Sequence, residues 1–162
     1  MSSLVLARID DRLIHGQIVT SWCKSTNANI ILIADEKLSK DSFTQRLLRA
    51  AAPPDIKVEI MDIENGALYL RENEQSSQKI ILITKVPEVM EQLIALGVKI
   101  NSINLGGMGA KTGRRQLNKN ISASPEEVEC LKRLMEKGIE LYYQLVPAER
   151  ATNLRSFLKG EK

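Results

Sequence analysis

Short apolar runs alternate along this chain with longer segments whose apolar residues have helical spacing. The runs are rich in Val, Ile and Leu, a composition typical of strands that are buried on both faces of a parallel sheet. We expect strands at residues 4–9, 29–35, 56–62, 79–85, 100–106, 118–124 and 139–147, with the one at 118–124 short.

The segments between the runs place apolar side chains three or four positions apart, which predicts helices. These helices are expected at residues 16–26, 39–52, 63–73, 88–97 and 124–138, with a terminal helix or tail at 148–160. Ser39 is the expected cap of the second helix, and Pro53 ends it. The apolar face of that helix consists of Phe43, Leu47, Leu48 and Ala51.

Strands that alternate with helices of about ten residues indicate βαβ crossovers. The predicted fold is therefore an open doubly wound α/β fold, with a mainly parallel sheet of about seven strands and helices on both faces. No repeat or linker divides the chain, so we expect one domain over residues 1–162. Ligands of such folds bind beyond the carboxyl ends of the strands, which singles out the loops 9–16, 84–87 and 105–116.

Composition narrows the classes of function. The chain is 43% hydrophobic and 27% charged, with a net charge of +3, which is typical of a soluble globular protein. With only 4% aromatic residues and dispersed basic residues, no nucleic-acid surface is expected. Cys23 and Cys130 are too far apart to indicate a disulfide framework or a metal cluster. No signal peptide or membrane span is expected, and the default setting is the cytosol.

His15, the single histidine, lies in the first of these loops. Arg8, Asp10 and Arg12 are close in sequence, and a helix is expected to begin just after His15. Arginines and helix N-terminal N–H groups bind phosphate oxygens, while an aspartate can orient a nucleophilic imidazole. The loop thus offers a nucleophile, an orienting group and an anion clamp. The plain alternative is a surface histidine in a charged loop.

The other two loops give weaker signals. The segment GGMGAKTGRR (106–115) matches neither the Walker A pattern, because Ala110 precedes Lys111, nor Gly-x-Gly-x-x-Gly. We interpret it as a mobile basic loop at the rim of the site. Thr84 ends an apolar strand, where its hydroxyl could bind a phosphoryl oxygen or serve the structure alone. Trp22 is expected to be a packing anchor. No metal site is predicted, because one histidine and scattered carboxylates do not form a ligand cluster.

The stretch RIDDRLIHGQIVTSW (8–22) resembles the signature of the enzyme IIB components in the mannose/fructose/sorbose family of the bacterial phosphoenolpyruvate-dependent sugar phosphotransferase system (PTS). Ile18 stands where the family has valine. INSINLGGMGAKTGRRQL (100–117) and SPEEVECLKRLMEKGIELYYQLVP (124–147) are similar to further family segments. The resemblance covers nearly the whole chain. It implies a mainly parallel open sheet with one antiparallel strand near its end.

The resemblance also implies a phosphocarrier. His15 would accept a phosphoryl group at Nδ1 from a phosphohistidine of a IIA partner and pass it to a sugar moving through membrane IIC and IID subunits. Arg12 would then clamp the phosphoryl group, Asp10 would orient His15, and Arg8 would support Asp10. The expected phosphoryl-binding residues are Gly16, Gln17, Thr84 and Lys111.

No cofactor is implied. The expected location is the cytoplasm, at the inner face of the membrane through IIC and IID, and a homo-oligomer is an option. Two other hypotheses stay open. One is a non-catalytic α/β module that binds phosphate or nucleotide through loop 105–116, and the other is a structural or regulatory interaction domain in which His15 is dispensable.

Overall fold

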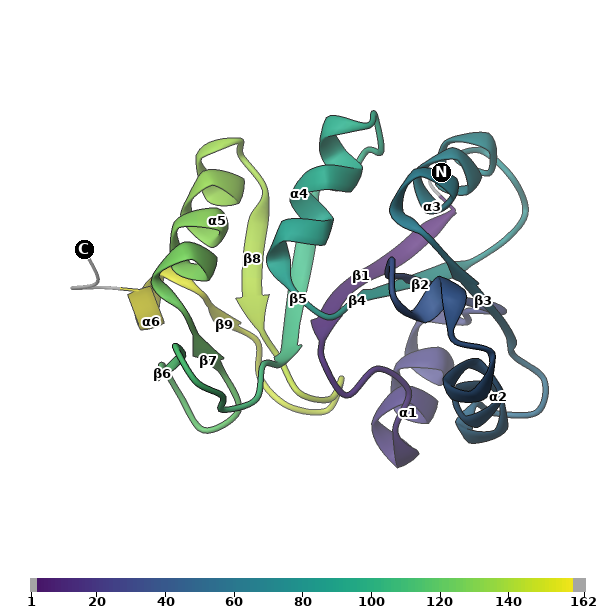
Figure 1. Cartoon of the computed structure of the whole chain (residues 1–162), viewed down its shortest axis with the longest axis horizontal. Helices are drawn as coiled ribbons and strands as arrows, with labels where there is room; N and C mark the ends of the chain where they lie inside the picture. The colour runs from purple at the N-terminus through teal and green to yellow at the C-terminus, as the bar shows by residue number, and fades with distance from the viewer. Residues whose placement is uncertain (1–2, 159–162) are drawn as a thin grey trace.

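The computed structural model describes residues 3–158, apart from the side chain of Ile18. Strands and helices alternate along most of the chain (Figure 1). In chain order the elements are β1 (Leu4–Asp10), α1 (Gly16–Thr26), β2 (Ile30–Ala34), the 3₁₀ turn η1 (Leu38–Lys40), α2 (Ser42–Ala51), β3 (Lys57–Met61), α3 (Ile63–Glu72), β4 (Ile80–Thr84), α4 (Pro87–Ala95), β5 (Ser102–Gly107), β6 (Arg115–Gln116), β7 (Ser122–Ala123), α5 (Pro125–Glu136), β8 (Glu140–Tyr143), β9 (Thr152–Asn153) and α6 (Arg155–Leu158).

Seven strands form one sheet in the order β3-β2-β4-β1-β5-β8-β9. Each neighbouring pair is parallel except β8 and β9, which run antiparallel. The central strands β2 and β4 are buried along their whole length, as their unbroken apolar runs predicted. The predicted mainly parallel sheet, with one antiparallel strand near the end, is confirmed.

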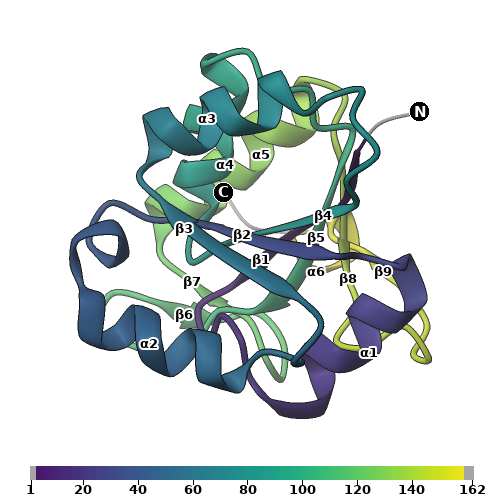
Figure 2. The ribbon, with the colours of Figure 1, turned by 90° about the vertical axis from the view of Figure 1, so that its right-hand side faces the viewer.

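Helices cover both faces of the sheet. In Figure 2, α1 and α2 lie below it, whereas α3, α4 and α5 lie above it. Each face has its own apolar core. Trp22, Cys23 and Leu48 pack in the core on the α1 side. Met90 and Leu131 belong to the core on the α5 side.

The two central neighbours β1 and β5 send the chain to opposite faces of the sheet. After β1 the chain enters α1, whereas after β5 it passes through β6 and β7 to α5 on the other face. Their carboxyl ends lie close together and point toward the lower half of the molecule in Figure 1. Such a switch point leaves a crevice beyond the strand ends where α/β folds bind ligands. Here a pocket lies between Asp11 and Arg12 on one side and the segment after β5, from Gly107 to Arg114, on the other.

The helix predicted at 39–52 has a different start and a different buried face. It begins at Ser42, and its cap is Asp41, whose side chain accepts a hydrogen bond from the Thr44 N–H. Ser39 lies instead in the preceding 3₁₀ turn. Phe43 and Leu47 are 63% and 56% exposed, so they are not core residues. The buried position of this helix is Leu48.

The short strand predicted at 118–124 is present, but it does not belong to the main sheet. The segment at 118–124 contributes only Ser122–Ala123, which pairs with β6 in a separate two-stranded sheet. The seventh strand of the main sheet is β9, within the segment predicted as a helix or tail. That segment also contains α6, and its residues 159–160 lie outside the described residues. The strand predicted at 139–147 ends at Tyr143, where the chain turns toward β9.

The helix predicted at 124–138 has the predicted N-terminus. Ser124 caps α5 by accepting a hydrogen bond from the Glu127 N–H, and the Glu127 carboxylate accepts one from the Ser124 N–H. This reciprocal pair is a capping box. Glu127 therefore has a fixed position at the N-terminus of α5.

Candidate functional site

Asp10 is the centre of a charged cluster at the carboxyl end of β1. Its side chain is inaccessible to solvent and accepts hydrogen bonds from Arg8 Nη2 at 3.0 Å and from Arg12 Nε at 3.1 Å. The Arg12 backbone N–H donates to Asp10 at 3.0 Å, and Arg12 Nη2 does so at 3.2 Å. One buried carboxylate thus holds two guanidinium groups in fixed orientations.

The charges in this cluster stabilise one another. Burial by itself would raise the pKa of Asp10, but the hydrogen bonds from Arg12 and the charge of Arg8 outweigh it and lower the pKa. Burial lowers the pKa of Arg8, although Asp10 partly offsets this. Asp10 therefore remains a carboxylate at neutral pH.

His15 contacts this cluster through one ring nitrogen. Its Nε2 lies 3.2 Å from Asp10 Oδ2, and its side chain is 26% exposed. A carboxylate at Nε2 favours the tautomer that carries its proton there, so the lone pair of the neutral ring is at Nδ1. The structure therefore brings Asp10 and His15 together in the arrangement needed for an oriented nucleophile.

Two residues with positive φ shape the loop that carries His15. Leu13 is buried with a φ of 61°, and its N–H donates to the Asp10 carbonyl at 3.0 Å. Gly16 has a φ of 50°, a backbone conformation that favours glycine. His15 itself is the N-cap of α1 and uses no side-chain hydrogen bond to cap the helix. The His15 ring is therefore not used to cap the helix. The N–H groups of the first turn of α1 follow it directly in the chain.

Arg8 is held from several sides, and most of its partners lie far from it in sequence. Its side chain is 2% exposed. Its Nη1 donates to the side chain of Asn104 on β5 and to the Gln144 carbonyl. The guanidinium lies 5.5 Å from the centroid of the Trp22 ring. Trp22, a packing anchor as predicted, also donates its indole N–H to the Leu145 carbonyl at 3.0 Å. Arg8 is therefore a rigid support for Asp10.

The glycines at the end of β5 allow the two arginines to approach the backbone. A Cβ at Gly106 would lie 2.1 Å from the Arg8 guanidinium carbon, and one at Gly107 would lie 2.7 Å from Arg12 Nη2. These glycines belong to the loop predicted at 105–116. Their role in the structure is to leave room for the charged cluster.

Gly106→Ala is expected to destabilise the protein by about 1–3 kcal/mol, because the buried Arg8 guanidinium has no free space to move into. The free energy of unfolding in urea measures this. Gly66→Ala is the control, since its Cβ would meet Ala34 at an ordinary 3.5 Å within helix α3. Equal stabilities of the two variants would contradict the close approach at Gly106.

The remaining predicted residues differ in their relation to the site. Gly16 and Gln17 open helix α1 directly after His15 and are exposed. The Thr84 hydroxyl is buried and donates to the Val86 carbonyl at 3.1 Å, so the structure gives it a structural bond. Lys111 is exposed in the loop after β5, and no described contact connects its side chain to His15.

The basic loop after β5 is only partly as predicted. Arg114 is not a mobile rim residue, because its side chain is 2% exposed and bonded to two carboxylates.

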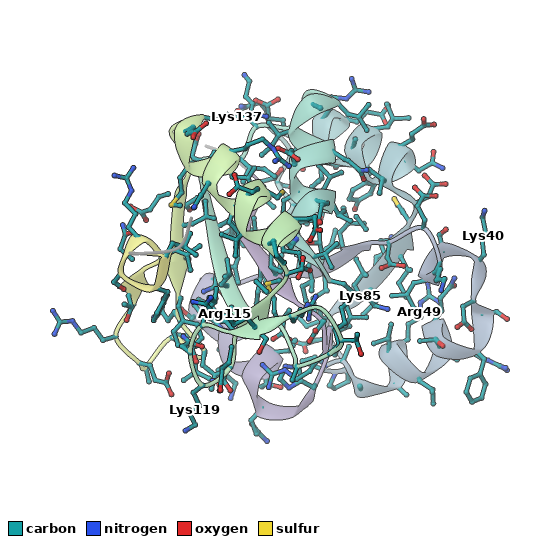
Figure 3. All side chains as sticks on the ribbon, turned by 60° about the vertical axis from the view of Figure 1, so that its left-hand side comes forward. Lys40, Arg49, Lys85, Arg115, Lys119 and Lys137 are labelled. Atoms are coloured by element: carbon teal, nitrogen blue, oxygen red, sulfur yellow. The ribbon has the colours of Figure 1, made fainter. Side chains whose placement is uncertain are left out.

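A pocket of about 450 Å³ lies between this loop and Arg12, and it is also lined by Gln116, Lys119 and Asn120. Figure 3 shows Lys119 at the edge of the molecule, in the connection between β6 and β7. Among the described residues, no group of His, Cys, Asp and Glu is arranged to hold a metal ion.

Comparisons with known proteins show the family of this chain. The family model of the PTS system sorbose subfamily IIB component matches residues 4–162. The sorbose-specific EIIB component of Klebsiella pneumoniae is 32% identical over 151 residues, which are 93% of this chain and 92% of that protein. The crystal structure of the IIBSor domain of its sorbose permease has a TM-score of 0.93 at 31% identity, covering 100% of this chain and 99% of that one.

A longer relative matches over part of its length. The mannose-specific EIIAB component of Escherichia coli K12 is 35% identical over 144 residues, or 89% of this chain. This chain spans only 45% of that relative. The resemblance predicted from the segment around His15 is confirmed by these matches. The chain belongs to the sorbose subfamily of PTS IIB components.

Proposed function

We propose that this chain is a phosphocarrier that accepts a phosphoryl group on Nδ1 of His15 and passes it to a sugar. The observation that carries this proposal is the His15–Asp10 contact, which occupies Nε2 and leaves Nδ1 as the attacking nitrogen. The partial exposure of His15 supports it, because a carrier must meet both a donor and an acceptor.

The proposed first step is the transfer of one phosphoryl group between two imidazoles. The lone pair of His15 Nδ1 forms a bond to phosphorus, while the N–P bond of the donor phosphohistidine breaks and its electron pair returns to the donor ring. The phosphorylated His15 ring keeps its proton on Nε2 and is cationic, so the Asp10 carboxylate stabilises it. In the second step a sugar hydroxyl oxygen forms a bond to phosphorus, the N–P bond breaks with its electron pair returning to His15 Nδ1, and the hydroxyl proton is released to solvent.

Arg12 is the proposed clamp for the phosphoryl oxygens. Its side chain is 42% exposed, and Asp10 holds the Nε and Nη2 side of the fork. No described hydrogen bond uses Nη1, which leaves that nitrogen for the phosphoryl group. The backbone N–H groups of Gly16 and Gln17, at the positive end of the α1 dipole, are proposed to contribute as well. Phosphoryl binding by Thr84 and Lys111 stays a prediction.

Arg12→Lys is expected to slow phosphorylation of His15 by roughly tenfold, because lysine keeps the charge but cannot bond Asp10 and phosphate at once. Stability should change by less than about 1 kcal/mol, since the side chain is partly exposed. Initial rates of phosphorylation measure the effect. Arg133→Lys is the matched control, because Arg133 also forms a two-pronged pair with a carboxylate, that of Glu91. An unchanged rate for Arg12→Lys would exclude Arg12 as the clamp.

The proposed partners follow from the family. They are a IIA protein or domain that carries the donor phosphohistidine, and membrane IIC and IID subunits that bring the sugar. The sugar is proposed to belong to the mannose, fructose, sorbose or amino-sugar class, since relatives are named for mannose, sorbose, fructose and N-acetylgalactosamine. No helix among the described residues is long and apolar enough to cross a membrane. We propose a cytoplasmic location with docking on IIC and IID, and self-association stays a prediction.

Phosphate transfer from labelled phosphoenolpyruvate, through the general carrier proteins and a IIA protein, tests the proposal. The expected result is acid-labile, alkali-stable label that peptide mapping places on His15. Absence of label, together with binding of a phosphate-containing ligand at loop 105–116, would favour the non-catalytic module instead.

A further inference from the structure

Arg114 forms a buried cluster with two carboxylates outside the group around Asp10. Its Nε and Nη2 donate to Glu127 at 2.9 and 2.8 Å, while its Nη1 donates to Asp11 Oδ2 at 3.1 Å. Nη1 also donates to the Gly109 carbonyl at 2.8 Å. Burial would lower the pKa of Arg114, but the bonds to Glu127 and Asp11 raise it. The guanidinium thus remains a cation that links the loop after β5 to α5 and to the His15 loop.

Asp11 is the partly exposed carboxylate of this cluster, and it lies in the pocket next to Arg12. It follows Asp10 and precedes Arg12 in the chain, and its side chain is 26% exposed. Its Oδ2 also accepts a hydrogen bond from the Gly109 N–H at 2.8 Å, and its own N–H donates to the Gly107 carbonyl. A carboxylate at this position would repel an incoming phosphoryl group unless a cation compensated it.

The pocket beside the site makes this charge relevant to an incoming anion. Asp11, Arg12 and Arg114 line the same pocket of about 450 Å³, which opens next to the proposed clamp. The Glu127 carboxylate accepts hydrogen bonds from the Ser124 N–H and from Arg114, and it does not line the pocket. Asp10 is inaccessible to solvent, so the carboxylate that an arriving phosphoryl group meets in this pocket is that of Asp11.

We propose that Arg114 is a positioning residue for phosphoryl transfer, which acts by compensating the charge of Asp11 in the pocket beside Arg12. This inference rests on the proposed phosphocarrier function. The hydrogen bonds that Arg114 and Asp11 share with Gly109 fix the wall of the pocket at the same time. An experiment can separate the effect of Arg114 on the charge of Asp11 from its effect on the pocket wall. When Asp11 is replaced by a neutral residue, there is no charge left to compensate, whereas the pocket wall still needs its hydrogen bonds.

The test compares variants that remove the cation with and without the carboxylate it compensates. Arg114→Met removes the cation bonded to Asp11. Glu127→Gln is combined with it, because Glu127 would otherwise be a buried carboxylate without its cation. The glutamine oxygen can still accept the Ser124 N–H. Phosphoramidate serves as the donor, so that no partner surface is involved: His15 Nδ1 attacks phosphorus, the N–P bond breaks and ammonia leaves.

The net charge of Asp11, Arg114 and Glu127 is −1 both before and after the Arg114→Met/Glu127→Gln change, but the double variant loses the cation bonded to Asp11, the carboxylate that lines the pocket. We therefore expect labelling to be roughly tenfold slower than in the unmodified chain. Adding Asp11→Asn should restore the rate to within about threefold, and added salt should reduce the difference between the two variants. A triple variant as slow as the double variant would overturn the proposal, as would a double variant of unchanged rate.

Two further variants complete the test. Arg133→Met with Glu91→Gln removes a comparable two-pronged pair between α4 and α5, and its labelling rate should not change. Arg114→Lys covers the case in which the double variant does not fold, because lysine retains the compensating charge. Its labelling rate should stay within about threefold of the unmodified rate, and a tenfold loss would overturn the proposal. Failure to label the unmodified chain at His15 from any donor would instead refute the phosphocarrier function itself.

Discussion

His15→Gln is expected to abolish phosphorylation of this chain by a phosphorylated IIA donor. The glutamine amide has no nitrogen lone pair comparable to that of Nδ1, so the N–P bond cannot form. Its amide N–H can still donate toward Asp10, which keeps the charged cluster intact. Stable incorporation of label should fall below detection, and the measurement is acid-labile, alkali-stable label after transfer from phosphoenolpyruvate.

Stability provides the control for this variant. His15 is half-buried, its described side-chain hydrogen bond is the one to Asp10, and it does not cap α1 through its side chain. We therefore expect the free energy of unfolding to change by less than about 1 kcal/mol. Normal labelling of a folded His15→Gln variant would refute the assignment of His15, and label at another residue would identify the true acceptor.

The strands could be predicted because their sequence signal is strong. A run such as Ile80–Thr84 is apolar throughout, and this pattern occurs where helices cover both faces of a sheet. Strand β9 could not be predicted in the same way. It has two residues, Thr152 and Asn153, and it exists because they pair with Tyr143 and Tyr142 of β8. Long-range pairing of this kind leaves no local pattern.

The face of a helix was harder to predict than its existence. Phe43 and Leu47 share a helical face, yet both are exposed, while Leu48 alone of this helix is buried. Helical spacing identifies residues that share a face, but it does not tell which neighbour covers that face. The position of α2 relative to the sheet decides this, and it depends on contacts that are distant in sequence.

The candidate site shows the same division between local and distant information. Asp10, Arg12 and His15 lie within six residues, so their cooperation could be predicted from the sequence. Asn104 and Arg114 come from segments about a hundred residues further along the chain, and only the pairing of β1 with β5 brings them to the site. Glycines preceding a basic stretch suggested mobility, whereas they permit close contact with buried guanidinium groups.

Asp10→Asn is expected to reduce phosphorylation of His15 by about 10²–10⁴-fold. In the present structure the Asp10 carboxylate faces His15 Nε2 and favours the proton there. An asparagine that directs its amide N–H toward Nε2 would favour the other tautomer, with the proton on Nδ1, and would remove the nucleophilic lone pair. The loss of the carboxylate would also remove the stabilisation of the cationic phosphorylated ring.

The same substitution should destabilise the fold by about 3–5 kcal/mol, because Arg8 would be a buried cation without its carboxylate. Rates must therefore be measured on the fraction that remains folded, as determined by unfolding in urea. Asp11→Asn is the matched control, since Asp11 is a neighbouring carboxylate that does not contact His15 and leaves Arg114 paired with Glu127. We expect its rate to stay within about threefold of the unmodified rate. Comparable losses of rate in both variants would show that charge near the site, rather than orientation of the imidazole, explains the effect of Asp10.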